Sequence, residues 1–126
     1  LGPRTVSDLI RPSGAWPGAQ FPYLSANLDF TNEANLASAA LPANDGAEAS
    51  TLHGKIAKYT VITVDGERIG VVGATTPTLA SITTVGNIAI RPAAPNDLDL
   101  LAAEIQPSVD ALVASGINKI ILLAHM

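Results

Sequence analysis

An apolar run near the C-terminal end of the chain constrains the fold more than any other feature. Residues 117–124 read Ile-Asn-Lys-Ile-Ile-Leu-Leu-Ala, and the second half of the run is apolar at successive positions. A strand that is apolar on both faces is typical of the interior of a parallel sheet covered on both sides. The run follows a helical pattern and Gly116, a residue suited to end a helix in the left-handed conformation. Helix, glycine and buried strand together predict the second half of a crossover unit in an α/β fold.

The helix of this unit has its own start signal. Asn96 or Asp97 can cap a helix that runs to about Ser115, because their side-chain oxygens accept unpaired amide hydrogens of the first turn. Pro107 lies inside the pattern and predicts a kink or a division into two helices. Burial of a large apolar side chain is worth roughly 1.5 to 3 kcal/mol, so packing should hold this helix. The apolar stripe comprises Leu98, Leu101, Ala102, Ile105, Val109, Leu112 and Val113.

A β-hairpin is predicted at residues 58–64 and 68–74. Both runs are rich in β-branched residues and are separated by Asp65, Gly66 and Glu67. Asp-Gly between such runs is a strong hairpin signal, because glycine accepts the positive φ that a tight turn requires.

Residues 21–30 alternate between polar and apolar side chains and predict one strand with an apolar face. Ser25 and Asn27 lie on its polar face, where we expect them to line a solvated sheet surface, although they could bond towards a site. Thr75 and Thr76 follow the second hairpin strand and are expected to cap the next turn. Gly73, just before them, indicates that other groups approach the backbone closely.

The remaining stretches carry weaker signals. Residues 4–10 predict a short helix, with Val6, Leu9 and Ile10 on one face and Pro12 as its stop. Residues 31–51 are rich in Ala, Asn, Asp and Glu, and predict a long surface excursion with a helical turn near 35–40. A helical turn at 79–84 and a short strand at 88–90 complete the expected elements.

Composition excludes several classes of protein. The 126 residues fit one domain, and a chain that is 48% apolar and 14% charged is too rich in core-forming residues to be disordered. A net charge of -4 with scattered Lys and Arg disfavours nucleic-acid binding. Without Cys, a metal would need imidazole, carboxylate or carbonyl ligands.

Both ends of the sequence suggest an excised segment. The chain has no initiator Met and stops at His125 and Met126, directly after the apolar run. We therefore expect an internal piece of a longer protein. These residues contain no apolar run long enough for a membrane span and no signal peptide.

His125 is the most informative candidate for a functional residue. Ligands of open α/β sheets gather at the carboxyl ends of the strands, where this histidine lies. A neutral imidazole there can donate a ring nitrogen to a metal; the alternative is a partly buried structural histidine. His53 is expected at the surface. The carboxylates form no acid/base pair or calcium loop recognisable from their spacing.

Three blocks resemble the 5'-nucleotidase branch of the calcineurin-like metallophosphoesterases. In chain order they are Phe-Pro-Tyr-Leu-Ser-Ala-Asn-Leu at 21–28, Gly-Glu-Arg-Ile-Gly-Val-Val-Gly-Ala-Thr-Thr-Pro at 66–77, and Ile-Ile-Leu-Leu-Ala-His-Met at 120–126. The second resembles the family strand that ends in Gly-x-Thr-Thr-Pro. The third resembles the family's apolar strand that ends in Ser/Thr/Ala-His-x, and the order and intervals fit the family across nearly the whole chain.

The resemblance implies a function for the intact protein. His125 would be a ligand of one of two divalent ions (Zn, Mn, Mg or Ca), about 3.5 to 4 Å apart, that activate a water and clamp the phosphoryl oxygens. The implied substrates are phosphate monoesters, nucleotides or cyclic nucleotides. The family is periplasmic or extracellular, often with a C-terminal substrate domain. Its Asp-x-His and Asn-His-Glu-Phe-Asp motifs would precede Leu1, its Gly-His-x-His/Gln motif would follow Met126, and no other catalytic or cofactor-binding residue carries over.

We therefore expect residues 1–126 to be an internal part of a single catalytic domain, truncated at both ends. The expected fold is α/β, a fragment of a two-sheet αββα sandwich with a β-hairpin and a helix that leads to a buried parallel strand. The fragment alone should be inactive, because one imidazole cannot supply the several ligands of a divalent ion. The alternatives are a non-catalytic α/β ligand-binding or interaction module in which His125 packs, and a degenerate family member that has lost its ligands.

Overall fold

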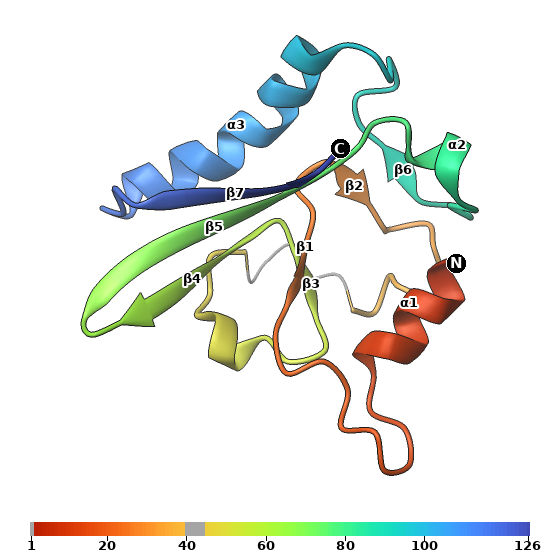
Figure 1. The fold of residues 1–126 in the computed structure, drawn as a ribbon, viewed down its shortest axis with the longest axis horizontal. Coiled ribbons are helices and arrows are strands. Elements are labelled where there is room, and N and C mark those ends of the chain that lie inside the picture. Colours follow the sequence, from red (N-terminus) through yellow and green to blue (C-terminus); the bar gives the residue numbers. More distant parts are fainter. Residues whose placement is uncertain (1, 40–44) are drawn as a thin grey trace.

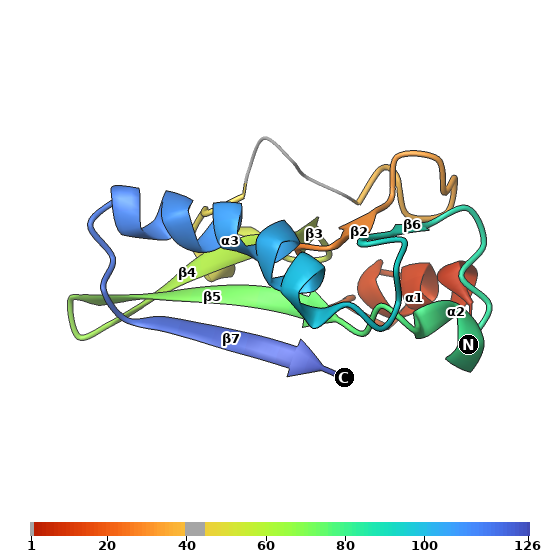
Figure 2. The ribbon, with the colours of Figure 1, turned by 90° about the horizontal axis from the view of Figure 1, so that it is seen from above.

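The computed structural model describes residues 2–39 and 45–126. At its centre is a three-stranded sheet with a long helix across one face, as Figures 1 and 2 show from two directions. The strand order is β4-β5-β7; β4 and β5 are antiparallel, whereas β5 and β7 are parallel and joined through the helix. These elements are β4 (Tyr59–Val64), β5 (Glu67–Thr75), α3 (Leu98–Ala114) and β7 (Ile120–His125). The predicted mixed α/β fold is confirmed, with its hairpin and its helix that leads to a parallel strand.

The hairpin turn forms where the Asp-Gly signal predicted it. Asp65 and Gly66 have φ values of 50° and 82°, and Val64 pairs with Glu67 across the turn. Two successive positive φ values give the tight turn that follows the twist of the strands.

Helix α3 begins and ends at the predicted signals. Asp97 caps it by accepting the Leu100 N–H at 2.9 Å, and Gly116 follows it with a φ of 85°. Its stripe packs on β5, because Leu101, Ile105 and Leu112 share a core with Val72, Ala74 and others. The ends of the predicted stripe are exposed instead: Leu98 is 64% and Val113 58% exposed.

Pro107 does not divide the helix into two, so that part of the prediction is wrong. Helix α3 runs without interruption from Leu98 to Ala114. Pro107 and Ala103 are both exposed, so the carbonyl that loses its intrahelical partner can bond to water instead. Packing of the buried stripe on the sheet keeps the two halves of the helix together.

The expectation that the last strand is covered on both sides is not met within this chain. β7 is the outer strand of its sheet, and its apolar side chains are about half exposed: Ile121 is 49%, Leu122 51% and Leu123 57% exposed. Among the described residues β5 alone pairs with it, and α3 contacts chiefly β5. The strand is parallel as predicted, but the apolar surface it carries exceeds what the described residues cover.

Residues 21–30 do not form the single predicted strand. They contribute β1 (Tyr23–Leu24), which pairs in parallel with β3 (Ile56–Ala57), and β2 (Leu28–Asp29), which pairs in antiparallel fashion with β6 (Ala89–Ile90). The chain between β1 and β2 leaves both small sheets and bonds to β5, where the Ala26 N–H donates to the Gly73 carbonyl at 2.8 Å. Residues 21–30 thus bond to β3, β5 and β6 in different places, and these different partners divide the predicted strand.

The other predicted elements appear with adjusted bounds, as α1 (Pro3–Ile10), α2 (Leu79–Ile82) and the short strand β6. In α1, Ile10 is fully buried, whereas Leu9 is 47% exposed. The excursion at 31–51 contains turns up to residue 39 and the 3-10 helix η2 (Ala49–Thr51); residues 40–44 lie outside the described part. No helix in residues 2–39 and 45–126 is long and apolar enough to cross a membrane.

Candidate functional site

His125 is the last residue of β7, at the edge where the parallel strands β5 and β7 both end. It pairs in register with Thr75, and the N–H of Thr76 donates to the His125 carbonyl at 2.8 Å. The end of one strand is therefore fixed against the end of the other. This is the edge at which ligands of parallel sheets gather.

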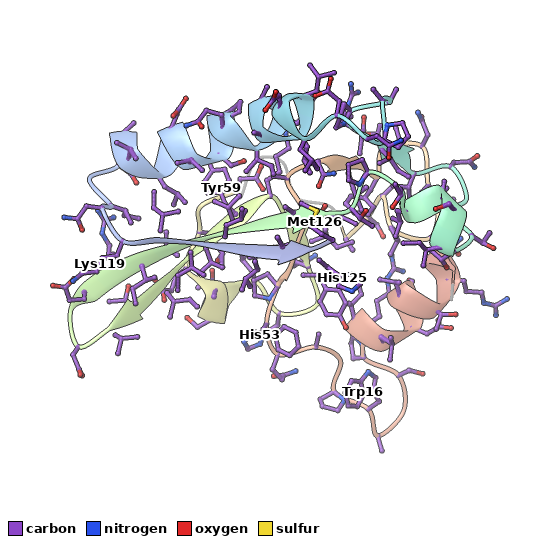
Figure 3. All side chains as sticks on the ribbon, turned by 45° about the horizontal axis from the view of Figure 1, so that its top comes forward. Trp16, His53, Tyr59, Lys119, His125 and Met126 are labelled. Carbon is purple, nitrogen blue, oxygen red and sulfur yellow. The ribbon has the colours of Figure 1, made fainter. Side chains whose placement is uncertain are left out.

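The imidazole of His125 lies on the face of the sheet opposite α3. Paired residues of neighbouring strands point to the same face, and Thr75 alternates with Val72 and Ala74, which line the core under α3. Figure 3 shows the His125 ring on the side of β7 turned away from α3. The side chain is exposed, so in this chain it does not pack in an apolar core.

Asn27 and Ser25 bond to the end of β5. Both are buried, so the prediction that they line a solvated sheet surface is wrong. Asn27 is 0% and Ser25 5% exposed. The Nδ2 group of Asn27 donates to the carbonyls of Thr75 at 2.8 Å and Arg91 at 2.9 Å, while its Oδ1 accepts the Thr75 N–H at 2.8 Å. The Ser25 and Thr75 hydroxyls are 2.9 Å apart. Their alternation with apolar residues predicted a solvated face. No local pattern in the sequence indicated that they bond to the end of β5.

The two threonines at the end of β5 differ in role. Thr76 caps the following turn as predicted, because its Oγ1 accepts the Thr78 N–H at 3.3 Å. Thr75 instead uses its hydroxyl and both backbone groups to bind Ser25 and Asn27. His53 is exposed, as predicted.

A cavity of about 480 Å³ lies on the α3 side of the molecule, with Ser25 and Asn27 in its lining. It is lined partly by charged residues that the sequence did not single out, namely Asp29, Asp45, Lys58, Arg91 and Glu104. Hydrogen bonds from Thr31, first from its side chain and then from its backbone, hold the pKa of Asp29 below its ordinary value. Burial raises the pKa of Asp45 above its ordinary value. Neither His125 nor Thr75 lines this cavity.

A divalent ion fits His125 as one ligand of a larger set. Its ring is an exposed nitrogen donor at a strand end, of the kind that metals such as Zn and Mn accept. Among the described residues, however, no three His, Cys, Asp or Glu side chains are grouped so as to hold a metal ion. The described part of the chain therefore contains no complete metal site, and an ion bound by His125 would need further ligands from other residues.

Comparison with known proteins gives one consistent group of relatives. No protein-family profile matches the chain. Over 135 aligned residues it is 29% identical to the trifunctional nucleotide phosphoesterase protein YfkN of Bacillus subtilis, with 99% of this chain and 9% of that protein covered. Over 111 aligned residues it is 36% identical to a 5'-nucleotidase of Diplobatis ommata, with 83% of this chain and 15% of that protein covered.

Solved structures agree with the sequence relatives. The fold is similar to that of the 5'-nucleotidase precursor of Thermus thermophilus, with a TM-score of 0.66, 27% identity and coverage of 99% of this chain and 19% of that one. It is also similar to the NAD nucleotidase of Haemophilus influenzae, with a TM-score of 0.56, 27% identity and coverage of 98% and 19%.

The chain thus spans less than a fifth of each of these four proteins. The matches extend over most of its residues, and they agree with the family that the three sequence blocks resemble. The chain belongs to the 5'-nucleotidase-type metallophosphoesterase family and corresponds to one segment of its longer members.

Proposed function

We propose that this chain works within a polypeptide of its relatives' length, as part of a phosphoesterase that hydrolyses phosphate monoesters or nucleotides. The reaction would be of the 5'-nucleotidase, alkaline phosphatase or cyclic phosphodiesterase type. Its relatives are named for nucleotide hydrolysis, and none of these names supports the alternative of a non-catalytic module. Residues 1–126 would form an internal part of the single catalytic domain.

His125 carries the proposal, because it is an exposed imidazole at the carboxyl end of β7. It would bind one of two divalent ions, whose identity among Zn, Mn, Mg and Ca the ring does not determine. Bound there, such ions lower the pKa of water and stabilise charge on phosphoryl oxygens. The chain's own contribution is to hold the imidazole at the strand end through the Thr76–His125 hydrogen bond.

The wider setting of the protein forms part of the same proposal. A location outside the cytoplasm is supported by the Thermus relative, which is described as a precursor. A C-terminal substrate domain would account for part of the greater length of the relatives. Substrates would be small phosphate esters rather than nucleic acid, since the chain has a net charge of -4.

Activity of the longer polypeptide tests the proposal. We expect hydrolysis of nucleoside monophosphates that is lost on chelation and restored by a divalent metal. His125→Ala should lower kcat/KM by more than about 100-fold, beyond the 10- to 100-fold typical of residues that only support metal ligands. His53→Ala, a change at the other, exposed histidine, should leave it unchanged. Full activity of His125→Ala would refute the assignment.

The isolated chain provides a second test. Because one imidazole cannot supply the several ligands of a divalent ion, residues 1–126 alone should hydrolyse p-nitrophenyl phosphate no faster than buffer with metal. Sustained turnover by the purified segment would show that it holds a complete site.

A further inference from the structure

Asn27 has the most complete set of bonds of any buried polar side chain at the strand ends. Both hydrogens of its amide and its carbonyl oxygen have partners at 2.8 or 2.9 Å, and a longer contact of 3.4 Å joins its Oδ1 to the Ser25 hydroxyl. Its backbone carbonyl also accepts the Arg91 N–H at 2.9 Å. A fully buried amide with all of these bonds made has one orientation available to it.

These bonds supply partners for the part of β5 that extends beyond the end of β4. The last residue of β5 to pair with β4 is Val72, opposite Tyr59, whereas β5 continues to Thr75. Beyond β4, the Ala26 N–H bonds to the Gly73 carbonyl, and the Asn27 side chain bonds to both the N–H and the C=O of Thr75. The amide thus pairs with Thr75 as the backbone of a neighbouring strand would.

On its other side the end of β5 holds the end of β7. Thr75 is in register with His125, and the Thr76 N–H donates to the His125 carbonyl. Asn27 is therefore linked to His125 through Thr75, because Asn27 bonds to Thr75 and Thr75 is paired with His125. The described residues make no hydrogen bond to the His125 ring, and the hydrogen bond from Thr76 holds the backbone of His125 instead.

We propose that Asn27 is a positioning residue for His125, which acts by fixing the carboxyl end of β5 against which β7 ends. The proposal rests on the proposed function, because it takes His125 to be a metal ligand. A ligand that shifts by a fraction of an ångström loses its fit to the ion, and residues that orient metal ligands typically contribute 10- to 100-fold in affinity. Ser25 assists through its hydroxyl contact with Thr75.

The test compares cobalt binding and amide exchange in variants of the longer polypeptide. Asn27→Asp has the same shape but loses the two donor hydrogens, so the carbonyls of Thr75 and Arg91 lose their partner. We expect it to weaken Co²⁺ binding by about 10- to 100-fold and to alter the visible spectrum of bound Co²⁺. Leu112→Ala, a core change under α3, is the control: it should lower stability and leave the Co²⁺ dissociation constant within about twofold.

The exchange of the Thr76 amide hydrogen reports the same arrangement without any metal. In Asn27→Asp its exchange should rise by more than the global loss of stability explains; in Leu112→Ala it should follow that loss only. Ser25→Ala is a milder variant for use where Asn27→Asp does not fold, with a smaller loss of Co²⁺ affinity, about three- to tenfold, below the full effect of an orienting residue.

The outcomes separate the two proposals. Wild-type Co²⁺ affinity and unchanged Thr76 exchange in Asn27→Asp, or in Ser25→Ala where that variant is the one measured, would overturn the positioning role and leave the proposed function intact. An equal loss of affinity in Leu112→Ala would also overturn it, as an effect of stability alone. If the wild type and His125→Ala bind Co²⁺ equally, the proposed function fails, and the positioning role fails with it even where the exchange of Thr76 changes.

Discussion

The neighbouring strands β5 and β7 both carry runs of apolar residues, but the described residues cover them to different extents. In β5, Val71 and Val72 are 4% and 0% exposed, with β4 and β7 on its two edges and α3 on one face. In β7, three successive apolar residues are about half exposed. The described residues thus cover both edges and the α3 face of β5 but leave the apolar side chains of β7 about half exposed. The candidate metal ligand lies on the less covered strand, but its position depends on the well-packed one.

The largest effect should follow from uncovering β5 beneath the helix. Leu112 is 1% exposed and fills the space above Gly70, where an added Cβ would lie 2.7 Å from its Cδ1. Leu112→Ala should reduce the free energy of unfolding of residues 1–126 by about 2 to 5 kcal/mol, measured by urea denaturation. Val113→Ala, at an exposed neighbour on the same helix, should stay within about 0.5 kcal/mol. Similar losses in both variants would mean that α3 does not cover β5 as described.

The second effect tests the close approach on the other side of β5. A Cβ on Gly73 would lie 2.3 Å from the carbonyl carbon and oxygen of Leu24, and backbone atoms there cannot move aside as a flexible side chain can. Gly73→Ala should therefore cost about 1 to 3 kcal/mol of unfolding free energy. Ala124→Val enlarges an exposed side chain on β7 and should change it by less than about 0.5 kcal/mol. If the two substitutions change the unfolding free energy equally little, β5 is not packed more closely than β7.

A third, pH-dependent effect concerns the segment that follows β5. Glu33 is 5% exposed and accepts the Asn87 N–H at 2.9 Å and the Asn35 side-chain amide at 2.7 Å. These bonds, the Asn87 one foremost, hold the pKa of Glu33 below its ordinary value. A lowered folded pKa gives stability that is present above the ordinary pKa of about 4.3 and is lost as the pH falls towards the folded pKa.

Replacement of this carboxylate isolates its titration from that of the other acids. Urea midpoints at pH 7 and pH 4 should fall less between the two values in Glu33→Gln than in the wild type, because the glutamine does not titrate. At pH 7 the wild type should be the more stable protein. Parallel pH curves would show that the Glu33 carboxylate does not anchor Asn87.

The smallest effect is expected on β7 itself. Leu123 is 57% exposed, so Leu123→Thr in residues 1–126 should change the unfolding free energy by less than about 0.5 kcal/mol. The same substitution in the longer polypeptide would reveal whether another segment covers this strand, since burial of a leucine is worth about 1.5 to 3 kcal/mol. A large loss already in residues 1–126 would contradict the open β7 described above.

Local signals predicted the parts of the fold that local chemistry determines. The Asp65-Gly66 turn, the Asp97 cap and the Gly116 terminator all lie where the sequence places them, because each depends on one or two residues. The uninterrupted helix through Pro107 was not predictable in this way. Its continuity depends on packing against a sheet formed by residues far away in the chain.

The sequence predicted the exposed residue of the candidate site, His125, but not the role of the buried residue Asn27. The position of His125 at a strand end follows from the apolar run before it. The role of Asn27 depends on Thr75, 48 residues later, and alternation along residues 21–30 cannot distinguish a polar face turned to water from one turned to a strand end. The division of those residues between β1 and β2 has the same long-range cause.

Anomalous scattering from crystals of the longer polypeptide soaked in Mn²⁺ or Zn²⁺ would test whether His125 is a metal ligand. We expect a metal peak about 2.0 to 2.3 Å from a ring nitrogen of His125, beside the ends of β5 and β7, with further ligands from residues outside this chain. A map with its metal peaks elsewhere, and the His125 ring packed against apolar side chains, would contradict it.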